Sequence, residues 1–446
     1  MTRPLAAIVM AGGLGTRMKS ARPKHLHPLL GRRLVDWAID AVRELEARPL
    51  VVVCAPETRS ELEEALPGVE LALQPEPRGT GDAAATARAV LDGFEGDVLV
   101  VPGDSPLLAP ELLSELVEEH RRERPAVTLL SVETEKRLPY GRIIRDRSGA
   151  VQRIVEERDA SPEEQAIREL NASVYVFSAD DLWWALERLD PGNAQGELYL
   201  TDTVGHLIDA GRPVAVARSY DVDAVQGVNT RVELAEAASV LRNRILERHM
   251  LAGVTVVDPA TTWIEADVRL ESDAVVHPFT VLRGQTVVRS GAEVGPHVVA
   301  VDAEIGAAAL VGPFAYLRPG TLVAGGAKVG TFVEVKNSRI GERTKVPHLS
   351  YIGDAEIGED TNIGAGAITA NFPHQPGRPK GRTTIGHNVR TGIHNGFEAP
   401  LSIGDGAWIG GGSYITDDVP GGALAIARAR QVTKEDYVRR KRGDDD

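Results

Sequence analysis

The chain has 446 residues, of which 43% are hydrophobic and 26% charged, a composition that predicts two or three globular domains and excludes a small disulfide-stapled module and a largely disordered chain. Fifty Lys and Arg residues against 64 Asp and Glu residues give a net charge of −14 at pH 7, which argues against a nucleic-acid partner or an anionic-membrane surface. The single cysteine, Cys54, lies in an apolar run and favours a reducing compartment. Since no apolar stretch approaches the length of a membrane span, about 18 residues, we expect a cytoplasmic protein without a membrane span.

Apolar runs alternate with amphipathic segments in the first half of the chain. Strands are expected at 6–10, 50–55, 97–101, 126–131 and 173–177, and helices at 35–47, 81–91 and 109–121. This alternation predicts an α/β domain over residues 1–228, with a mainly parallel, Rossmann-like sheet covered by helices. A charged, Ala-rich segment at 229–250 predicts a helical linker arm.

A different pattern begins near residue 251 and continues to residue 446. A short apolar residue followed by glycine recurs there, mostly on a six-residue lattice, as in Val294-Gly295, Ile305-Gly306 and Val311-Gly312. Such a lattice predicts a parallel β-helix of hexapeptide repeats, of the left-handed type. The stretch 370–384, rich in proline and glycine, breaks the lattice and predicts an extruded loop.

A glycine-rich loop follows the first expected strand. In the run Met10-Ala11-Gly12-Gly13-Leu14-Gly15-Thr16-Arg17-Met18 the glycines let main-chain N–H groups approach a phosphate, and Arg17 and Lys24 add positive charge. The spacing is neither that of the dinucleotide-binding motif nor that of the P-loop. On these residues alone, a structural turn is the alternative to a phosphate site.

The loop resembles the Gly-x-Gly-Thr-Arg-Met and Pro-Lys signature of the sugar-1-phosphate nucleotidyltransferases. Further matching segments follow in order: Gln74, Gly79-Thr80-Gly81, Gly103-Asp104-Ser105-Pro106-Leu107, Tyr140-Gly141-Arg142, Ile154-Val155-Glu156-Glu157, Glu169-Leu170-Asn171, Asn193-Ala194-Gln195-Gly196-Glu197, Thr201-Asp202 and Gly227-Val228-Asn229. With the hexapeptide repeats, the whole chain resembles the bifunctional N-acetylglucosamine-1-phosphate uridyltransferase/glucosamine-1-phosphate acetyltransferase family. The resemblance implies an α/β nucleotidyltransferase domain joined to a left-handed β-helix that assembles as a homotrimer.

In the first half, the resemblance implies transfer of UMP from UTP to N-acetylglucosamine-1-phosphate. Arg17 and Lys24 would stabilise the transition-state charge, and Asp104 and Asn229 would ligate Mg²⁺. The UTP and UDP-sugar site would be formed by Ala11, Gly12, Gly13, Lys24, Gln74, Gly79, Thr80, Gly103, Gly141, Glu156, Asn171 and Asn229. The chain departs from the family pattern at Pro102 and at Ala172-Ser173.

In the second half, the resemblance implies acetyl transfer from acetyl-CoA to glucosamine-1-phosphate. His348, in a segment that matches the family motif His-Leu-x-Tyr-x-Gly-Asp, would act as general base. Glucosamine-1-phosphate would be bound by Arg318, Lys336, Tyr351 and Asn362, and acetyl-CoA by Ala365, Asn371, Phe372, Ile393, Gly411 and Arg428. Phe372, Ile393 and Gly411 differ from the family's usual residues.

Two alternatives accompany this interpretation. One is a nucleotidyltransferase with another sugar or base preference. The other is a nucleotidyltransferase whose β-helix is a trimerisation scaffold without chemistry. A scaffold without chemistry would not need His348, Lys336 and Asn371 together. These three residues therefore discriminate between the hypotheses.

Overall fold

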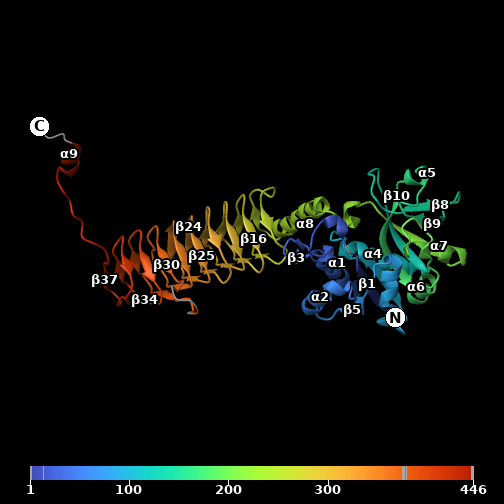
Figure 1. Cartoon of the computed structure of the whole chain (residues 1–446), viewed down its shortest axis with the longest axis horizontal. Helices are drawn as coiled ribbons and strands as arrows, with labels where there is room; N and C mark the ends of the chain where they lie inside the picture. Colours follow the sequence, from blue (N-terminus) through green and yellow to red (C-terminus); the bar gives the residue numbers. More distant parts are fainter. Residues whose placement is uncertain (1–2, 14, 374–376, 378, 443–446) are drawn as a thin grey trace. The chain divides into compact units, whose positions relative to one another are not determined.

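The computed structural model describes residues 3–13, 15–373, 377 and 379–442, which divide into two compact units, 1–241 and 242–446. Figure 1 shows the whole chain, and each unit is described separately. Among the described residues, no helix is long and apolar enough to cross a membrane.

Unit 1 is built on a sheet whose strands follow the order β11-β7-β10-β6-β1-β4-β5. The bounds are β1 (Leu5–Ala11), β4 (Leu50–Cys54), β5 (Glu70–Leu73), β6 (Asp97–Pro102), β7 (Val127–Glu133), β10 (Glu169–Ser178) and β11 (Val214–Ser219). Neighbours pair in parallel, except that β10 runs antiparallel to β6 and β7. The expected mainly parallel sheet is therefore confirmed.

Helices cover both faces of this sheet because its central strands are apolar on both sides. Ala7 and Val9 pack with α1 (Leu34–Arg43) and α4 (Pro110–Glu123). Ala6 and Ile8 face the other way, toward α3 (Thr80–Thr86), α6 (Ala179–Leu186) and α7 (Asp202–Asp209). Every residue of β4 is buried, as expected of an interior parallel strand.

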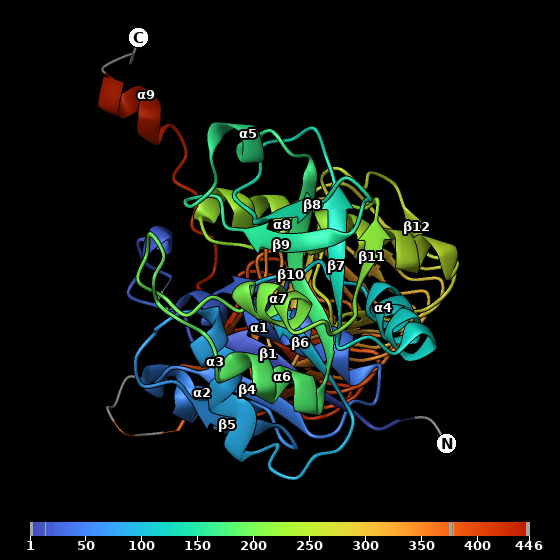
Figure 2. The ribbon, with the colours of Figure 1, turned by 90° about the vertical axis from the view of Figure 1, so that its right-hand side faces the viewer.

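The remaining elements of unit 1 lie at its periphery. They are α2 (Arg59–Ala65), α5 (Pro162–Gln165), β2 (Pro28–Leu29), β3 (Arg32–Arg33), β8 (Arg142–Arg145), β9 (Val151–Val155) and the 3-10 turns η1 (Thr16–Met18), η2 (Lys24–Leu26), η3 (Pro56–Thr58), η4 (Ala87–Ala89) and η5 (Asp223–Val225). The β8–β9 hairpin pairs with the start of β10, and Figure 2 shows α5 above this hairpin. The helix expected at 81–91 is shorter than predicted, because α3 ends at Thr86 and continues only as the turn η4.

Unit 2 coils into a parallel β-helix. The described coils stack into three parallel sheets. The first holds β12 (Thr255–Val256), β15 (Val275–Val276), β18 (Glu293–Val294), β21 (Leu310–Val311), β24 (Lys328–Thr331) and β27 (Lys345–His348). Asn362 forms a β-bridge to Lys345 on one side and to Arg390 on the other. Beyond this bridge, the same side of the coil continues as a ladder of β32 (Arg390–Thr391), β35 (Trp408–Ile409) and β37 (Leu424–Ala425). The second holds β13 (Trp263–Ile264), β16 (Val281–Arg283), β19 (Val299–Val301), β22 (Tyr316–Leu317), β25 (Glu334–Lys336), β28 (Tyr351–Gly353), β30 (Ile368–Ala370), β33 (Gly396–Glu398) and β36 (Tyr414–Ile415). The third holds β14 (Arg269–Leu270), β17 (Val287–Val288), β20 (Glu304–Ile305), β23 (Leu322–Val323), β26 (Arg339–Ile340), β29 (Ala355–Ile357), β31 (Thr383–Ile385) and β34 (Leu401–Ile403).

The apolar residue of each hexapeptide points into this coil. Val276, Val294, Val311, Val329 and Val346 are at most 2% exposed, so they form a continuous column in the core. The lattice breaks where expected: Arg339 pairs with Glu356, 17 residues on, but Glu356 pairs with Thr384, 28 residues on. Part of that insertion, 374–376 and 378, lies outside the described residues.

One helix, α8 (Arg231–Leu251), occupies the segment predicted as a linker arm. The division between the two units falls within it, after Leu241, rather than at either of its ends. The short helix α9 (Tyr437–Arg442) lies near the end of unit 2.

Candidate active sites

A cavity of about 540 Å³ opens at the carboxyl ends of β1, β5 and β6 in unit 1. The carboxyl ends of parallel strands meet at one edge of a sheet, which is where ligands bind in open α/β folds. The glycine-rich loop follows β1, Gln74 follows β5 and Asp104 follows β6, and all of them line the cavity. Segments far apart in the sequence therefore meet as the motifs predict.

Lys24 lies at the centre of the polar contacts in this cavity. Its ammonium pairs with the Asp104 carboxylate and donates to the Asn229 Oδ1 at 3.1 Å. The Arg17 guanidinium donates to the same Asn229 oxygen at 2.9 Å. Burial raises the pKa of Asp104, but the charge and hydrogen bond of Lys24 lower it more, so that the pKa lies below its usual value and the carboxylate is ionised.

Asn229 is held in place by the first turn of α8. The Glu233 carboxylate accepts hydrogen bonds from the main-chain N–H groups of Asn229 and Thr230, both at 2.7 Å. Because its main chain is tied to the helix, the Asn229 side chain has a fixed position opposite Asp104.

These oxygens fit the Mg²⁺ ion that the resemblance implies. Asp104 and Asn229 contribute one carboxylate and one amide oxygen, and both converge on the cationic group of Lys24. Gly227 lies beside the carboxylate, since a Cβ there would make an ordinary contact of 3.5 Å with Asp104 Oδ1. A hard cation that keeps several waters and binds substrate phosphates suits such a sparse oxygen set.

The predicted nucleotide residues line the other side of the cavity. Gln74 is 3% exposed and donates to Gly79 O at 3.3 Å and to Asp82 Oδ2 at 2.9 Å. A Cβ on Gly12 would overlap the Gln74 amide, so glycine is needed for this approach. Thr80 Oγ1 accepts from Leu200 N at 3.0 Å.

Ala11 and Gly103 are chain neighbours of lining residues but do not line the cavity themselves. Ala11 ends β1 and Gly103 directly follows the adjacent strand β6, and Gly103 N donates to Met10 O at 2.8 Å. A Cβ on Gly103 would crowd Met10 O and the Ala11 side chain.

Gly141, Glu156 and Asn171 lie close together, the first and last buried and Glu156 half-buried, but none of them lines the 540 Å³ cavity. Asn171 N donates to Gly141 O at 2.8 Å, and Glu156 Oε1 accepts from Thr201 Oγ1 at 2.9 Å. Burial is the main cause that raises the pKa of Glu156. Glu156 lines a second cavity, of about 450 Å³, while Ala172 and Ser173, next to Asn171 in the chain, line the first.

Two residues that the sequence analysis did not single out belong to the first cavity. Tyr140 lines it and accepts a hydrogen bond from Gly227 N at 2.9 Å. His25 lines it beside Lys24, and burial, together with the Lys24 charge, lowers its pKa to about 3. Tyr140 belongs to the segment Tyr140-Gly141-Arg142, but neither side chain has a sequence pattern of its own that marks it as functional.

In unit 2, His348 ends β27 and is exposed. Its main-chain oxygen accepts from Ser350 Oγ at 2.8 Å, whereas its imidazole makes no hydrogen bond to any residue that the structure describes. The main chain is therefore fixed, and the ring remains available to a ligand.

Three cations converge near this histidine's coil and are named here the cation cluster: Arg318, Lys336 and Lys380. Contact with the Lys336 ammonium lowers the pKa of Lys380, and the Arg318 charge acts in the same direction. Lys336 Nζ lies 3.5 Å from Asp354 Oδ2, and Arg318 Nη1 donates to Glu334 Oε1 at 2.8 Å. The mutual repulsion favours binding of an anion such as a sugar phosphate. Lys380 was missed because it lies in the loop that breaks the lattice.

Two further residues predicted for the sugar phosphate lie on the same coils. The phenol of Tyr351 lies over Gly353, where a Cβ would overlap it. The Tyr351 group also interacts electrostatically with Arg318 and Lys336. Asn362 bridges Lys345 and Arg390 through its main chain, and it is half-buried.

The residues predicted for acetyl-CoA fall into two groups. Ile393 is 58% exposed and lies against Gly411, because a Cβ on Gly411 would be 3.4 Å from Ile393 O. Arg428 lies beside the next residue, Gly412, where a Cβ would be 3.9 Å from Arg428 Cδ. Ala365 O accepts from His394 N at 2.7 Å, which brings Ala365 next to Ile393. Asn371 instead is buried and donates to Asp354, and Phe372 is 74% exposed.

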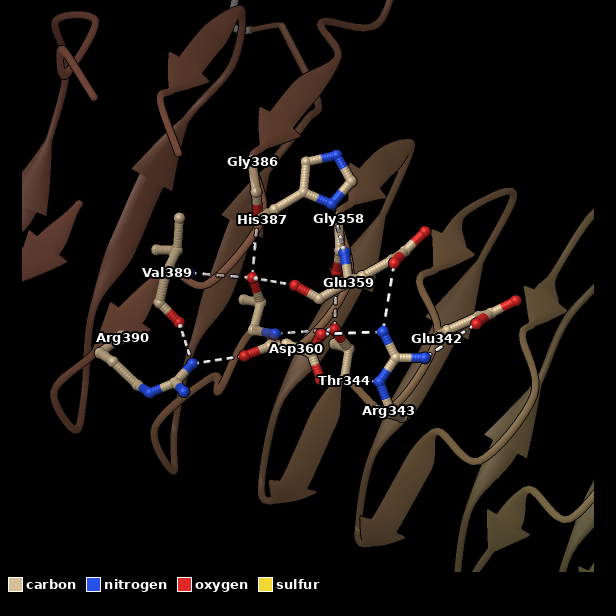
Figure 3. Close-up of polar contacts among 11 residues, drawn as sticks. Glu342, Arg343, Thr344, Gly358, Glu359, Asp360, Gly386, His387, Val389 and Arg390 are labelled. Carbon is tan, nitrogen blue, oxygen red and sulfur yellow. Dashed lines mark hydrogen bonds and ion pairs between the residues drawn. The ribbon is translucent and has the colours of Figure 1, made fainter. Parts of the chain in front are cut away.

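A different corner of the same coils carries a charged network whose cation is already paired with carboxylates. Figure 3 shows Arg343 with Glu342, Glu359 and Asp360, at 2.9, 3.2 and 2.8 Å. His387 Nδ1 accepts from Glu359 N at 3.1 Å. Because the cation is matched by three carboxylates, this network joins successive coils and does not resemble an anion site.

The comparisons with known proteins agree with both units. The family model of the MobA-like NTP transferase domain matches residues 7–190. Relatives called bifunctional protein GlmU include one from Streptomyces avermitilis, 49% identical over 99% of this chain and 95% of the relative. Those from Mycobacterium tuberculosis and Thermoanaerobacter pseudethanolicus are 44% and 43% identical, each over 98% of this chain and over 92% and 98% of the relative.

Proposed function

The chain belongs to the family of bifunctional GlmU proteins, and on that premise we propose that it catalyses two consecutive reactions. Unit 2 acetylates glucosamine-1-phosphate with acetyl-CoA. Unit 1 then transfers UMP from UTP to the resulting N-acetylglucosamine-1-phosphate, giving UDP-N-acetylglucosamine and pyrophosphate. The observation that carries the proposal is that each unit holds its own group of cations, Arg17 and Lys24 in unit 1 and the cation cluster in unit 2.

In unit 1, the sugar-phosphate oxygen attacks the α-phosphorus of UTP, and the bond to pyrophosphate breaks. The attacking phosphate is already ionised, so positioning and charge stabilisation carry the catalysis. Arg17 and Lys24 stabilise the charge that builds up on the transferred phosphoryl group. Asp104 and Asn229 would hold Mg²⁺, which when bound neutralises triphosphate charge.

The base and the sugar are bound on opposite sides of that reacting centre. We assign Gln74, Gly79 and Thr80 to the uracil, which the fixed Gln74 amide would read through hydrogen bonds. Gly141, Glu156 and Asn171 are assigned to the N-acetylated sugar. Their support is the hydrogen bond from Asn171 N to Gly141 O beside Ala172 and Ser173, together with the approach of Glu156 to Gly141, where a Cβ would lie 3.6 Å from Glu156 Oε1.

In unit 2, His348 takes the proton from the glucosamine amine as the nitrogen attacks the thioester carbon. The tetrahedral intermediate then expels the CoA thiolate. The exposed imidazole without a partner among the described residues supports this role. The cation cluster holds the sugar phosphate, with Tyr351 and Asn362 at the hydroxyls.

Acetyl-CoA is assigned to the ledge formed by Ala365, Ile393 and Gly411. The Ala365 N–H would stabilise the oxyanion of the intermediate. Arg428 would pair with CoA phosphates, and Asn371 and Phe372 would border the site from the loop. The proposal includes assembly as a homotrimer through the β-helix, and a cytoplasmic location, where UTP and acetyl-CoA are available.

A one-substrate-at-a-time assay tests the proposal. Glucosamine-1-phosphate with acetyl-CoA must release CoA in the absence of UTP. N-acetylglucosamine-1-phosphate with UTP and Mg²⁺ must release pyrophosphate in the absence of acetyl-CoA. Failure of the first reaction alone would support the scaffold alternative for unit 2, and pyrophosphate release with another sugar phosphate only would support a different sugar preference.

A further inference from the structure

The polar side chain of His25 lines the uridylyl-transfer cavity, but the proposed mechanism gives it no role. It lies in the turn η2, between Lys24 and Leu26, and is 4% exposed. Its ring lines the cavity, with Cε1 4.0 Å from the position of a Cβ on Gly13. It thus lies between the glycine-rich loop and the Lys24–Asp104 pair.

The two ring nitrogens of His25 have no hydrogen-bond partner among the described residues. The ring lines the cavity, so a bound molecule can approach it. Buried polar groups are normally satisfied, so a side chain this enclosed, lining a cavity and without a partner among the described residues, points to a ligand.

The ring chemistry suits a phosphate without adding charge. Burial and the adjacent Lys24 keep the imidazole uncharged, and a neutral imidazole has one N–H donor and one acceptor nitrogen. An anionic ligand selects the tautomer that donates. His25 lies beside the main chain of Gly13. A glycine-rich turn of this kind binds phosphate oxygens.

We propose that His25 is a binding residue for the triphosphate of UTP, donating a hydrogen bond to a phosphate oxygen, and that it makes the same contact to pyrophosphate in the reverse reaction. This inference rests on the proposed function of unit 1. It assigns to His25 a share of nucleotide affinity that Lys24 and Arg17 do not provide. Because the contact is to a non-reacting oxygen, it strengthens the binding of substrate and transition state alike.

Three variants of the full chain test the proposal. His25→Phe keeps a ring of similar size and removes both nitrogens, whereas His25→Gln keeps an N–H donor. His27→Phe is the matched control, since His27 is equally buried but does not line the cavity. Isothermal titration with UTP and Mg²⁺, and with pyrophosphate and Mg²⁺, gives Kd, and steady-state kinetics give kcat and KM.

His25→Phe is expected to raise Kd and KM for UTP and for pyrophosphate by about 10-fold or more, the usual loss for a hydrogen bond to a charged group. The kcat, the KM for N-acetylglucosamine-1-phosphate and the acetyl-transfer rate should stay near wild type. His25→Gln should recover much of the affinity, and His27→Phe should leave it unchanged.

Unchanged UTP affinity in His25→Phe would overturn the proposal, as would equal losses in His25→Phe and His25→Gln together with a lower melting temperature, which would assign a packing role. A wild-type chain that fails to bind UTP would overturn the proposed function of unit 1 itself. The two failures are therefore distinguishable.

Discussion

Asp104 remains ionised in a buried position because the neighbouring Lys24 opposes the effect of burial. Burial alone raises the pKa of a carboxylate, and the charge and hydrogen bond of Lys24 lower that of Asp104 below its usual value. The result is a permanent negative charge at the edge of the sheet, facing the Asn229 oxygen. A divalent cation bound there would compete with the Lys24 ammonium for the same two oxygens.

The variant Asp104→Ala should abolish UDP-N-acetylglucosamine formation and leave acetyl transfer at the wild-type rate. It removes the carboxylate that would bind the cation, and it leaves Lys24 without its ion-pair partner. Pyrophosphate release and CoA release, measured on the same preparation, check this. Parallel loss of both activities in a folded variant would contradict the assignment of two separate sites.

The variant His348→Ala should lower acetyl transfer by about 10²-fold to 10⁴-fold, the usual contribution of a general base. Uridylyl transfer from supplied N-acetylglucosamine-1-phosphate should be unaffected. Near-wild-type acetyl transfer by the variant, at an unchanged melting temperature, would remove His348 from the mechanism.

At the residue scale, the sequence predicted best those side chains that belong to a contiguous motif. Arg17, Lys24 and Asp104 stand in recognisable segments, and the structure brings them together. His25 and Lys380 were not predicted. The role inferred for each depends on which residues surround it in space, and an isolated histidine or a loop lysine carries no spacing from which that environment could be deduced.

Glycines set the spacing of the coils at the element scale. A Cβ on Gly364 would overlap the main chain of Gly392 in the next coil, whereas a Cβ on Gly325 would make only an ordinary contact of 3.4 Å. We expect Gly364→Ala to destabilise the β-helix by about 1–3 kcal/mol through overpacking and to lower the melting temperature by roughly 2–10 °C. Gly325→Ala is the control and should melt within about 1–2 °C of wild type.

Thermal unfolding monitored by circular dichroism measures both variants. Equal melting temperatures for Gly364→Ala and Gly325→Ala would contradict the close approach of the coils at Gly364.

Asp354 connects the coils of the acetyl-transfer site. It accepts from Asn337 at 2.6 Å, from Asn371 and from Lys336. Burial raises its pKa, but these donors outweigh it and hold the pKa below the usual value. A carboxylate with a lowered pKa in the folded state stabilises the fold above its usual pKa of about 3.9, and this stabilisation is lost as the pH falls through the folded-state value.

The variant Asp354→Ala should therefore be less stable than wild type at pH 7 by about 1–3 kcal/mol, because it leaves buried donors without their acceptor. The difference should be constant down to about pH 5 and shrink below about pH 4. Urea unfolding at several pH values measures it. A difference that grows on acidification would show that the sign of the Asp354 contribution is wrong.

The elements themselves were predictable where one periodicity dominates. The wholly apolar run of β4 and the six-residue lattice of unit 2 each allow one structure, and both are confirmed. The end of α3 at Thr86 was not predictable, because it depends on packing against distant segments. Ser173 is an example: its backbone is left-handed, with φ 58, because it lies in the bulge of β10. No residue pattern in this strand predicts the bulge.

At the scale of the whole molecule, the two units are separately compact, and each contains its own group of cationic side chains. This separation predicts that the two reactions are chemically independent and share only the intermediate N-acetylglucosamine-1-phosphate. A free intermediate can diffuse from one chain to another. The activities should therefore be supplied equally well by two different chains in the same solution.

Complementation between the two inactive variants tests this claim most directly. Asp104→Ala and His348→Ala are purified separately and then mixed with glucosamine-1-phosphate, acetyl-CoA, UTP and Mg²⁺, and the products are followed by ³¹P NMR. Asp104→Ala alone should accumulate N-acetylglucosamine-1-phosphate, His348→Ala alone should leave glucosamine-1-phosphate unconverted, and the mixture should form UDP-N-acetylglucosamine. If the mixture forms no UDP-N-acetylglucosamine although both variants are folded, or if either variant alone completes the sequence, two independent sites with these residues at their centres are contradicted.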